Sequence, residues 1–251
     1  ASPLIRNTMK TGVLVLIKDI TFQKQLEKLR SDFVANVSHE LKTPITSIIG
    51  YLELLMIKLE VNNEQKHYLE KVVNQTNRLN AIIDDLLKLS KIESQEEDNT
   101  IILKPQNLKP ILISAKDDIY GLIEKNENTI SINCVESMTA NVDSQLLREA
   151  VINLLENSIK YGDTNGPLKI MVEKDSKIKI HVENIGNPIN KKYQKRIFQR
   201  FYRIDKSRTR KAGGTGLGLA IVKHIAIVHG GEVSVKSLEN RVTRFTISLP
   251  R

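Results

Sequence analysis

A histidine and a glutamate are adjacent in the segment Ser38-His39-Glu40-Leu41-Lys42-Thr43-Pro44. A neutral imidazole is a good nucleophile, but its ring nitrogen must lose a proton after it attacks a phosphorus atom. Glu40 can hold the other ring nitrogen in the required tautomer and accept that proton as a general base. His39 lies one position off an apolar stripe, between Val37 and Leu41, so its ring is expected at the edge of a helix where a ligand can reach it.

Two further residues of this segment bear on the histidine. Thr43 is four residues beyond His39, hence one helical turn away on the same face, where its hydroxyl could position a water molecule. Pro44 has no N–H for the carbonyl of Glu40, and its ring crowds that carbonyl, so a kink or flexible joint is expected here. Most single histidines on helices have no chemical role, and we apply that interpretation to His67, His181, His224 and His229.

A helical pattern at Ser144–Tyr161 carries Asn153 and Asn157 four residues apart on one face. Carboxamide oxygens suit a hydrated Mg²⁺, which takes few protein ligands. Lys160 offers a positive charge to a phosphate group. Two asparagines on a helix more often form a solvated face, so this pattern needs support from elsewhere in the chain.

A glycine-rich run, Gly213–Leu219, leads directly into a helical pattern that ends near Val228. Glycines allow close backbone approach, and a helix N-terminus offers N–H groups to phosphates. A Rossmann site is not indicated, because its β-α-β unit and acidic residue are missing, and a Walker lysine is missing too. The preceding positions 200–211 hold six basic residues opposed by Asp205 alone, which favours a mobile lid over a triphosphate rather than a solvated loop. Phe198 and Phe201 are expected to anchor the lid.

Apolar periodicity predicts two long helices, one from Phe22 to about Leu59 and one from about Glu64 to Glu93, with the turn at Asn62-Asn63. A hairpin of two helices leaves an apolar stripe in water, which dimerisation into a four-helix bundle would cover. After the acidic stretch 95–99 the pattern becomes mixed α/β, which indicates a separate domain. Helices are expected at 108–124, 144–161 and 217–228, and strands at 129–135, 168–173, 177–182, 232–236 and 244–249. A strand is also expected at 10–21.

The composition is that of a folded protein of 251 residues, with 40% hydrophobic and 27% charged residues. No apolar run is long enough for a membrane-spanning helix, and the single Cys134 cannot form an intrachain disulfide, so a reducing setting is expected. A net charge of +9 suits nucleic acid, an anionic membrane or phosphate-bearing partners. An aromatic content of 4% without tryptophan weighs against a protein that stacks on bases.

Four segments together resemble the sensor histidine kinases of two-component systems. Phe33–Pro44 resembles their H-box, Asn153–Tyr161 the N-box, Arg196–Arg203 the F-box that precedes the ATP lid, and Gly213–Leu219 the second glycine box. The resemblance implies an all-α helical hairpin that forms a dimeric four-helix bundle, followed by an α/β sandwich of the GHKL or Bergerat type that binds ATP with Mg²⁺. It implies further that His39 is the phosphoacceptor, that Glu40 is its acid–base partner and that Thr43 serves in dephosphorylating the partner protein.

The resemblance also implies a nucleotide site. Its residues are Asn153, Asn157, Lys160, Tyr161, Asn184, Gly186, Arg203, Gly214, Thr215, Gly216, Leu217 and Gly218, with Asn157 as the magnesium ligand. The first glycine box departs from the family pattern. Asn184 stands where the family has an aspartate for the adenine amino group, and Pro188 stands where it has a second glycine. An amide oxygen still accepts a hydrogen bond but gives up the charge, so weaker nucleotide binding is expected.

The implied organisation is a PAS-like sensor tail and junction at 1–21, a dimerisation and phosphoacceptor domain at 22–95, a linker at 96–106 and an ATP-binding domain at 107–251. The expected partners are a second copy of the chain, the receiver domain of a response regulator, and upstream sensor and membrane-spanning segments outside this sequence. The piece would then be the cytoplasmic portion of a membrane-anchored bacterial receptor.

Three other functions compete with the kinase interpretation. ATPases of the same fold generally carry a glutamate at the position of Asn153, and an amide there cannot activate water. A non-catalytic dimeric signalling scaffold with a degraded ATP site is supported by Asn184 alone. Nucleic-acid binding is supported by charge alone.

Overall fold

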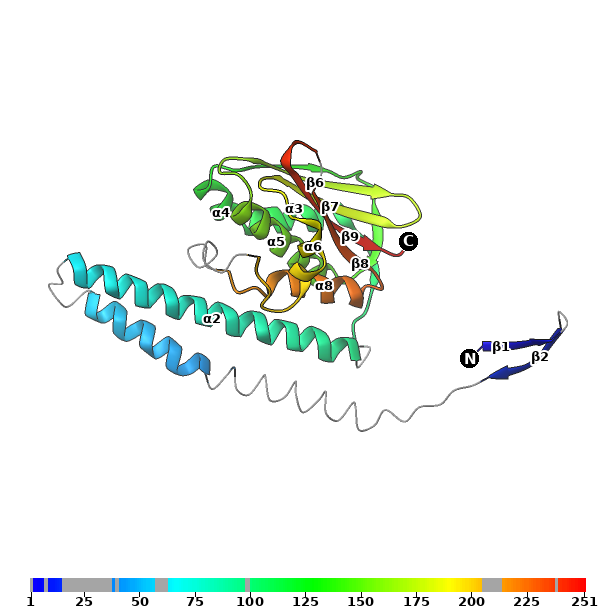
Figure 1. Ribbon diagram of the computed structural model, residues 1–251, viewed down its shortest axis with the longest axis horizontal. Coiled ribbons are helices and arrows are strands. Elements are labelled where there is room, and N and C mark those ends of the chain that lie inside the picture. The colour runs from blue at the N-terminus through cyan, green and yellow to red at the C-terminus, as the bar shows by residue number, and fades with distance from the viewer. Residues whose placement is uncertain are drawn as a thin grey trace.

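The chain forms a helical hairpin and a mixed α/β unit whose helices lie between the hairpin and a β-sheet (Figure 1). The computed structural model describes residues 2–6, 9–14, 38, 41–56, 63–97, 100–204, 214–237 and 239–251. Several predicted features lie outside this description, namely His39, Glu40, residues 15–21, the turn at residue 62 and the lid segment 205–213.

The N-terminal strands β1 (Ser2–Arg6) and β2 (Met9–Leu14) pair antiparallel, with an irregularity between Leu4 and Ile5. The strand expected at 10–21 therefore appears as β2, which begins one residue earlier and is described as far as Leu14. Its partner β1 was not predicted from the sequence.

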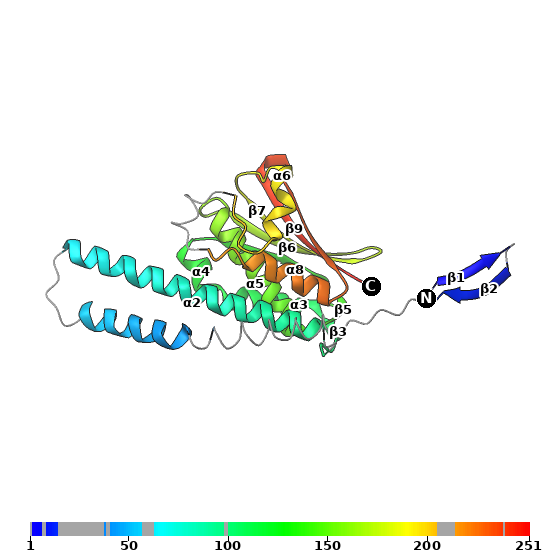
Figure 2. The same cartoon turned by 60° about the horizontal axis from the view of Figure 1, so that its bottom comes forward.

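The helical hairpin consists of residues 41–56 and the long helix α2 (Asn63–Glu97), which lie side by side in both views (Figures 1 and 2). Lys42 Nζ lies 2.6 Å from Asp84 Oδ1 and joins the two helices. Ile45 and Ile83 are buried, each 4% exposed. Asn63 begins α2 and is therefore helical, although the sequence placed it in the turn.

One side of the hairpin remains apolar and exposed in the single chain. Its exposed large side chains are Leu41, Ile48, Tyr51, Leu54, Leu55, Val72 and Leu79. On α2, a groove is lined by Lys71, Val72, Gln75, Thr76 and Leu79. Among the helices that the structure describes, none is both long and apolar enough to cross a membrane.

The main sheet has the strand order β4-β6-β7-β9-β8. Its strands are β4 (Thr129–Asn133), β6 (Pro167–Lys174), β7 (Ile178–Ile185), β8 (Glu232–Ser237) and β9 (Val242–Leu249). The β4–β6 pair is parallel and the other pairs are antiparallel. Strands β3 (Lys104–Asn107) and β5 (Thr139–Val142) form a separate antiparallel pair, so regular structure begins inside the segment assigned to the linker.

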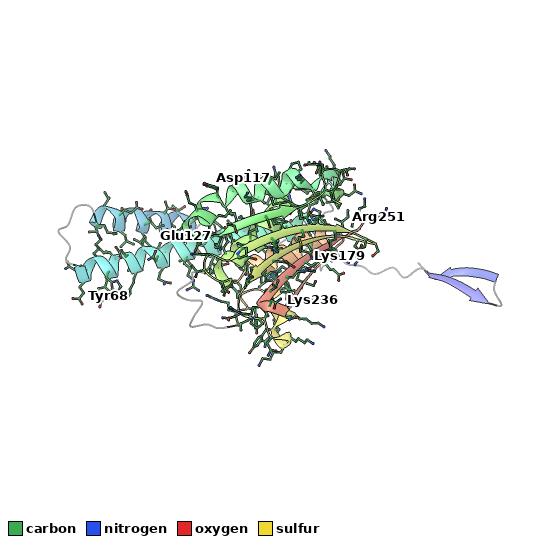
Figure 3. The ribbon with its side chains drawn as sticks, turned by 90° about the horizontal axis from the view of Figure 1, so that it is seen from above. Tyr68, Asp117, Glu127, Lys179, Lys236 and Arg251 are labelled. Carbon is green, nitrogen blue, oxygen red and sulfur yellow. The ribbon has the colours of Figure 1, made fainter. Side chains whose placement is uncertain are left out.

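Four helices pack with the sheet: α3 (Leu108–Asp118), α4 (Tyr120–Lys125), α5 (Ser144–Tyr161) and α8 (Gly218–Val228). The segment between β7 and α8 contains the short helices α6 (Lys191–Gln194) and η1 (Arg196–Phe198). A second short turn, η2 (Glu239–Arg241), precedes β9. The helix expected at 108–124 is thus divided at Ile119 into α3 and α4. Figure 3 shows the sheet from above, with Lys179 and Lys236 on its strands.

The core lies between the sheet and helices α3, α5 and α8. Its large apolar side chains are almost completely buried, with at most 2% of each exposed: Leu154, Ile170, Ile180 and Phe245. The C-terminal half of α2 joins this core through Leu89 and Ile92, which are 1% and 4% exposed. These two side chains dock the long helix onto the α/β unit.

Candidate functional site

The helix α5 brings the predicted N-box residues to the edge of α8. Its N-terminus is fixed by Asp143, whose Oδ1 accepts from the backbone N–H groups of Gln145 and Leu146 at 2.9 Å each. Asn153 and Asn157 follow on the half-buried side of the helix. At the other end, a Cβ added to Gly214 would lie 2.8 Å from Lys160 Nζ and 3.3 Å from the Tyr161 hydroxyl oxygen. Lys160 and Tyr161 therefore border the glycine turn.

The glycine turn 214–218 leaves the N-terminus of α8 open. Among the described residues, no side chain of the N-cap residue Leu217 bonds this end of α8, so its first N–H groups can donate to an anion. Gly216 has φ +79°, a backbone conformation that glycine adopts without strain, and its carbonyl accepts from Phe201 N at 2.9 Å. Thr215 Oγ1 accepts from Leu217 N at 3.1 Å and orders the turn from within.

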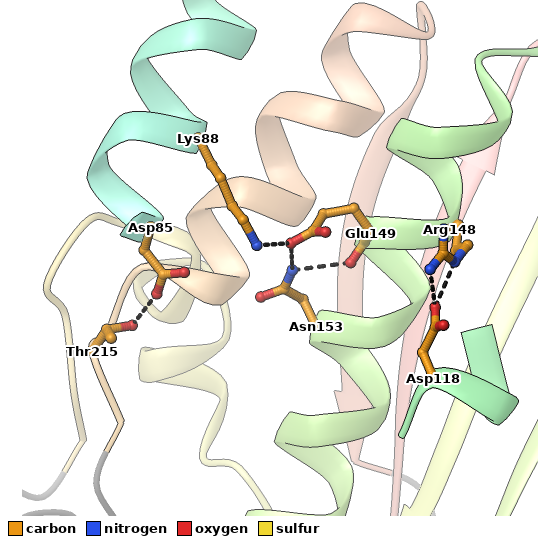
Figure 4. Close-up of polar contacts among 7 residues, drawn as sticks. All are labelled: Asp85, Lys88, Asp118, Arg148, Glu149, Asn153 and Thr215. Carbon is orange, nitrogen blue, oxygen red and sulfur yellow. Dashed lines mark hydrogen bonds and ion pairs between the residues drawn. The ribbon is translucent and has the colours of Figure 1, made fainter. Parts of the chain in front are cut away.

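The amide of Asn153 is oriented by Glu149, one turn earlier on α5 (Figure 4). Asn153 Nδ2 donates to the Glu149 carbonyl at 2.9 Å and to Glu149 Oε1 at 3.3 Å. Its Oδ1 then faces α8, where a Cβ added to Gly218 would lie only 2.6 Å away. An amide oxygen and helix N–H groups therefore meet beside the glycine turn.

Positive charge converges on the same place. Burial lowers the pKa of Lys160, and the nearby guanidinium groups of Arg203 and Arg78 lower it further. Arg203 Nε and Nη2 and Arg78 Nε are buried, and within the described part of the chain none has a hydrogen-bond partner. Buried unpaired donors are costly and cations repel one another, so the arrangement fits a bound polyanion such as a triphosphate.

Asn184 and Gly186 lie at the far end of this region, beside the C-terminus of α5. A Cβ added to Gly186 would lie 3.0 Å from the Tyr161 carbonyl oxygen and 3.3 Å from Asn184 Nδ2. Asn184 is 7% exposed, and its Nδ2 makes a long bond of 3.4 Å to the Ile185 carbonyl. The structure thus brings the first glycine box next to Tyr161 and Gly162, at the C-terminal end of α5.

A resident metal site built from protein ligands alone is not present among the residues described, since no cluster of three His, Cys, Asp or Glu side chains could hold an ion. The amide oxygens of Asn153 and Asn157 remain as hard ligands on α5. This donor set fits Mg²⁺, which keeps several waters and is held mainly by substrate phosphates.

Besides Arg78, the α2 side chains Asp85, Lys88 and Glu93 reach the α/β unit, and the sequence reasoning missed them. Asp85 Oδ2 accepts from Thr215 Oγ1 at 2.7 Å, and Lys88 Nζ lies 2.7 Å from Glu149 Oε1 (Figure 4). Glu93 pairs with Arg200. Burial raises the pKa of Asp85, although the bond from Thr215 opposes this. In the sequence these charged residues look like the solvated face of a helix. The one signal for a docking surface is that they lie on the same side of α2.

His224 lies in this interface, with Nε2 3.1 Å from Glu93 Oε1. Burial lowers its pKa to about 4, helped by the charges of Arg200 and Lys223. Arg200 already neutralises Glu93, so the carboxylate does not raise the pKa of the ring. The His224 imidazole is therefore neutral at pH 7.

Acid should destabilise the protein through His224. The unfolded chain protonates this ring near pH 6.5 and the folded protein only near pH 4, so stability is lost as the pH falls through this interval. The difference corresponds to about 3 kcal/mol. We expect His224→Gln to reduce this loss in urea unfolding measured from pH 7 to pH 4, whereas His67→Gln, on the exposed part of α2, should not. Equal acid sensitivity in both variants would contradict the assignment.

The phosphoacceptor segment is described from Leu41 onward. Thr43 and Pro44 are exposed within the helical residues 41–56, and Ser47 Oγ donates to the Thr43 carbonyl at 3.2 Å. The kink expected at Pro44 remains a prediction, because it depends on Glu40. The expectation for Phe201 was wrong. Phe198 is buried, but Phe201 is 56% exposed, because the chain turns there with φ +59° and points the ring outward.

Comparison with known families covers both parts of the chain. Residues 29–95 match the family described as the His Kinase A (phospho-acceptor) domain. Residues 142–251 match the family described as histidine kinase-, DNA gyrase B- and HSP90-like ATPase. The two matches fall on the helical hairpin and on the unit that holds the glycine turn.

Two curated relatives match nearly the whole chain. Phosphate regulon sensor protein PhoR of Pseudomonas aeruginosa is 37% identical over 237 residues, which cover 93% of this chain and 53% of that protein. Sensor histidine kinase WalK of Bacillus subtilis is 33% identical over 245 residues, which cover 95% of this chain and 39% of that protein. The chain therefore spans about half of these relatives or less.

Two solved structures share the fold. Full-length ShkA, in complex with AMPPNP, has a TM-score of 0.66 at 21% identity over 87% of this chain and 45% of its own. The catalytic domain of histidine kinase ThkA has a TM-score of 0.52 at 26% identity over 60% of this chain and 97% of its own. The first likeness extends across both the helical hairpin and the α/β unit.

Proposed function

Because the chain belongs to the sensor histidine kinases, we propose that it transfers the terminal phosphoryl group of ATP to its own His39 and then to an aspartate on a response regulator. The observation that carries the proposal is the anion site at the N-terminus of α8. Open helix N–H groups, Lys160 and the buried unpaired nitrogens of Arg203 meet there, and a helix of the phosphoacceptor hairpin packs against it.

In the autokinase step the His39 ring nitrogen attacks the terminal phosphorus, the bond from phosphorus to the bridging oxygen breaks, and ADP leaves with that oxygen. Glu40 orients the imidazole and takes up the proton that the attacking nitrogen releases. The α8 N–H groups and Lys160 hold the phosphates in place, since phosphoryl transfer depends mainly on positioning and charge stabilisation. Arg203 satisfies its buried donors on the same phosphates.

Bound Mg²⁺ neutralises charge that develops on the phosphate oxygens. Asn157 is the proposed ligand on the protein, and Asn153 supplies an oriented amide oxygen beside it. Asn184 accepts the adenine amino group through an amide rather than a carboxylate. Nucleotide affinity is therefore proposed to be weaker than in relatives with aspartate there.

Dimerisation follows from the exposed apolar side of the hairpin. A second copy that covers residues such as Ile48, Leu55 and Leu79 would complete a four-helix bundle. Within the dimer we propose the boundaries 22–95 for the phosphoacceptor domain and 107–251 for the ATP-binding domain, with β3 extending the latter to Lys104. A response-regulator receiver domain is the proposed partner, and a cytoplasmic position below a membrane-anchored sensor is the proposed setting.

The direct test is incubation of the chain with γ-labelled ATP and Mg²⁺, followed by acid and alkali treatment and mass-spectrometric site mapping. The expected product carries one acid-labile, alkali-stable phosphoryl group on His39. Nucleotide binding without any phosphohistidine would favour the signalling scaffold, which among the residues of the described site only Asn184 supports.

Thr43 is proposed to act only in dephosphorylation of the partner. Its position one turn beyond His39 suits it to hold a water molecule against an aspartyl phosphate. Thr43→Ala should leave autophosphorylation within about two-fold and slow loss of phosphate from the regulator by about ten-fold or more. Thr46→Ala is the matched control, since Thr46 is an exposed threonine of the same helix, three residues beyond Thr43. Equal loss of both activities in Thr43→Ala would contradict the separate role.

A further inference from the structure

One carboxylate oxygen links the long hairpin helix to the nucleotide site. Glu149 Oε1 lies 2.7 Å from Lys88 Nζ and 3.3 Å from Asn153 Nδ2 (Figure 4). Lys88 belongs to α2, whereas Glu149 and Asn153 belong to α5. The chain of contacts therefore runs from the phosphoacceptor hairpin to an amide beside the glycine turn.

Glu149 holds the Asn153 amide by two acceptors, its backbone carbonyl at 2.9 Å and its carboxylate at 3.3 Å from Nδ2, and the carboxylate is the one that α2 can influence. An ionised carboxylate only accepts hydrogen bonds, so the amide must turn its NH₂ group toward Glu149. Asn153 Oδ1 then faces Gly218, at the open end of α8. A flipped amide would present a donor there, where the helix N–H groups already point, and a donor could not serve as a ligand for Mg²⁺.

Lys88 holds the Glu149 side chain in this position. Burial alone would lower the pKa of Lys88, but its bond to Glu149 and the charges of Asp85 and Glu156 outweigh burial and raise it. The Lys88 side chain is 49% exposed and that of Glu149 is 30% exposed. Exposed pairs of this kind add little to stability, so the consequence of the contact is orientation rather than stability.

We propose that Lys88 is a positioning residue for magnesium–nucleotide binding, which acts through Glu149 to orient the Asn153 amide. The inference rests on the proposed function. Its consequence is that the nucleotide site is complete only when α2 is docked. Because coupling between two equilibria is reciprocal, nucleotide should tighten the docking of α2 by the same factor.

The first test measures binding of the non-hydrolysable ATP analogue AMPPNP, with Mg²⁺, by calorimetry on the full chain. Lys88→Gln should raise the dissociation constant about three- to ten-fold. Lys91→Gln removes an exposed lysine of the same helix and should leave it unchanged. An unchanged constant in Lys88→Gln would overturn the positioning role. If the wild-type chain itself failed to bind, the proposed function would be rejected with it.

A charge swap separates orientation from docking. Lys88→Glu combined with Glu149→Lys restores an ion pair between α2 and α5. The backbone carbonyl at position 149 still accepts from Asn153 Nδ2, but a lysine side chain there only donates and cannot replace the carboxylate acceptor. Hydrogen exchange of the α2 amides near Leu89 and Ile92 should therefore return to wild-type protection, while AMPPNP binding stays weak. Recovery of both in the swap would overturn the inference, because Lys88 would then act through docking alone.

Discussion

Replacement of His39 by glutamine is expected to reduce acid-labile phosphorylation from ATP by at least about 100-fold, to the background of the assay. Glutamine keeps the approximate size and polarity of the side chain but has no nucleophilic ring nitrogen. Binding of AMPPNP should stay within about two-fold of wild type, because the anion site is built from α5, the glycine turn and α8. The measurement is incorporation of γ-labelled phosphate at matched protein concentration.

The matched control for this substitution is His67→Gln, which changes an exposed histidine on α2. It should retain full incorporation. Acid-labile label that persisted in His39→Gln would reject His39 as the acceptor. If label and AMPPNP binding were both lost, the substitution would instead have damaged the fold.

Local signals were sufficient for the helices that carry the site. The range Ser144–Tyr161 was predicted to the residue, because Asp143 is a strong N-cap and apolar residues recur along one face. The strands of the main sheet were found within a few residues, because β-branched runs alternate with turn residues. The pair β3 and β5 was missed, since four-residue strands far apart in the chain have no periodicity to detect.

Tertiary contacts between the two parts could not be read from either part alone. Leu89 and Ile92 continue the apolar stripe of α2, yet they pack into the core of the α/β unit rather than into the hairpin. Asp85 and Lys88 look like ordinary surface charges until Thr215 and Glu149 are placed opposite them. The composition of the site was thus predictable from motifs, whereas its dependence on α2 required the structure.

Replacement of Arg203 is expected to have opposite effects on stability and on nucleotide binding. Its buried Nε and Nη2 have no partner within the described residues, and its charge lies near Lys160. Without nucleotide, both features destabilise the folded chain, since a buried unsatisfied donor costs about 1–3 kcal/mol. Arg203→Gln should therefore raise the free energy of unfolding of the nucleotide-free protein by about 1 kcal/mol, measured by urea titration.

The same substitution should weaken AMPPNP binding about ten-fold or more, because it removes a charged group whose two buried nitrogens are the proposed donors to the phosphates. Arg244→Gln provides the reverse case. Arg244 Nε lies 2.5 Å from Glu183 Oε1, and the Glu183 side chain is 12% exposed, so loss of the arginine leaves a nearly buried carboxylate unpaired. Arg244→Gln should lower stability and leave AMPPNP binding unchanged, since Glu183 alternates to the opposite face of β7 from Asn184. If Arg203 served only to stabilise the fold, Arg203→Gln would lower stability and leave AMPPNP binding unchanged, as expected for Arg244→Gln. A loss of stability in Arg203→Gln would therefore refute the proposal that Arg203 is a donor to the phosphates.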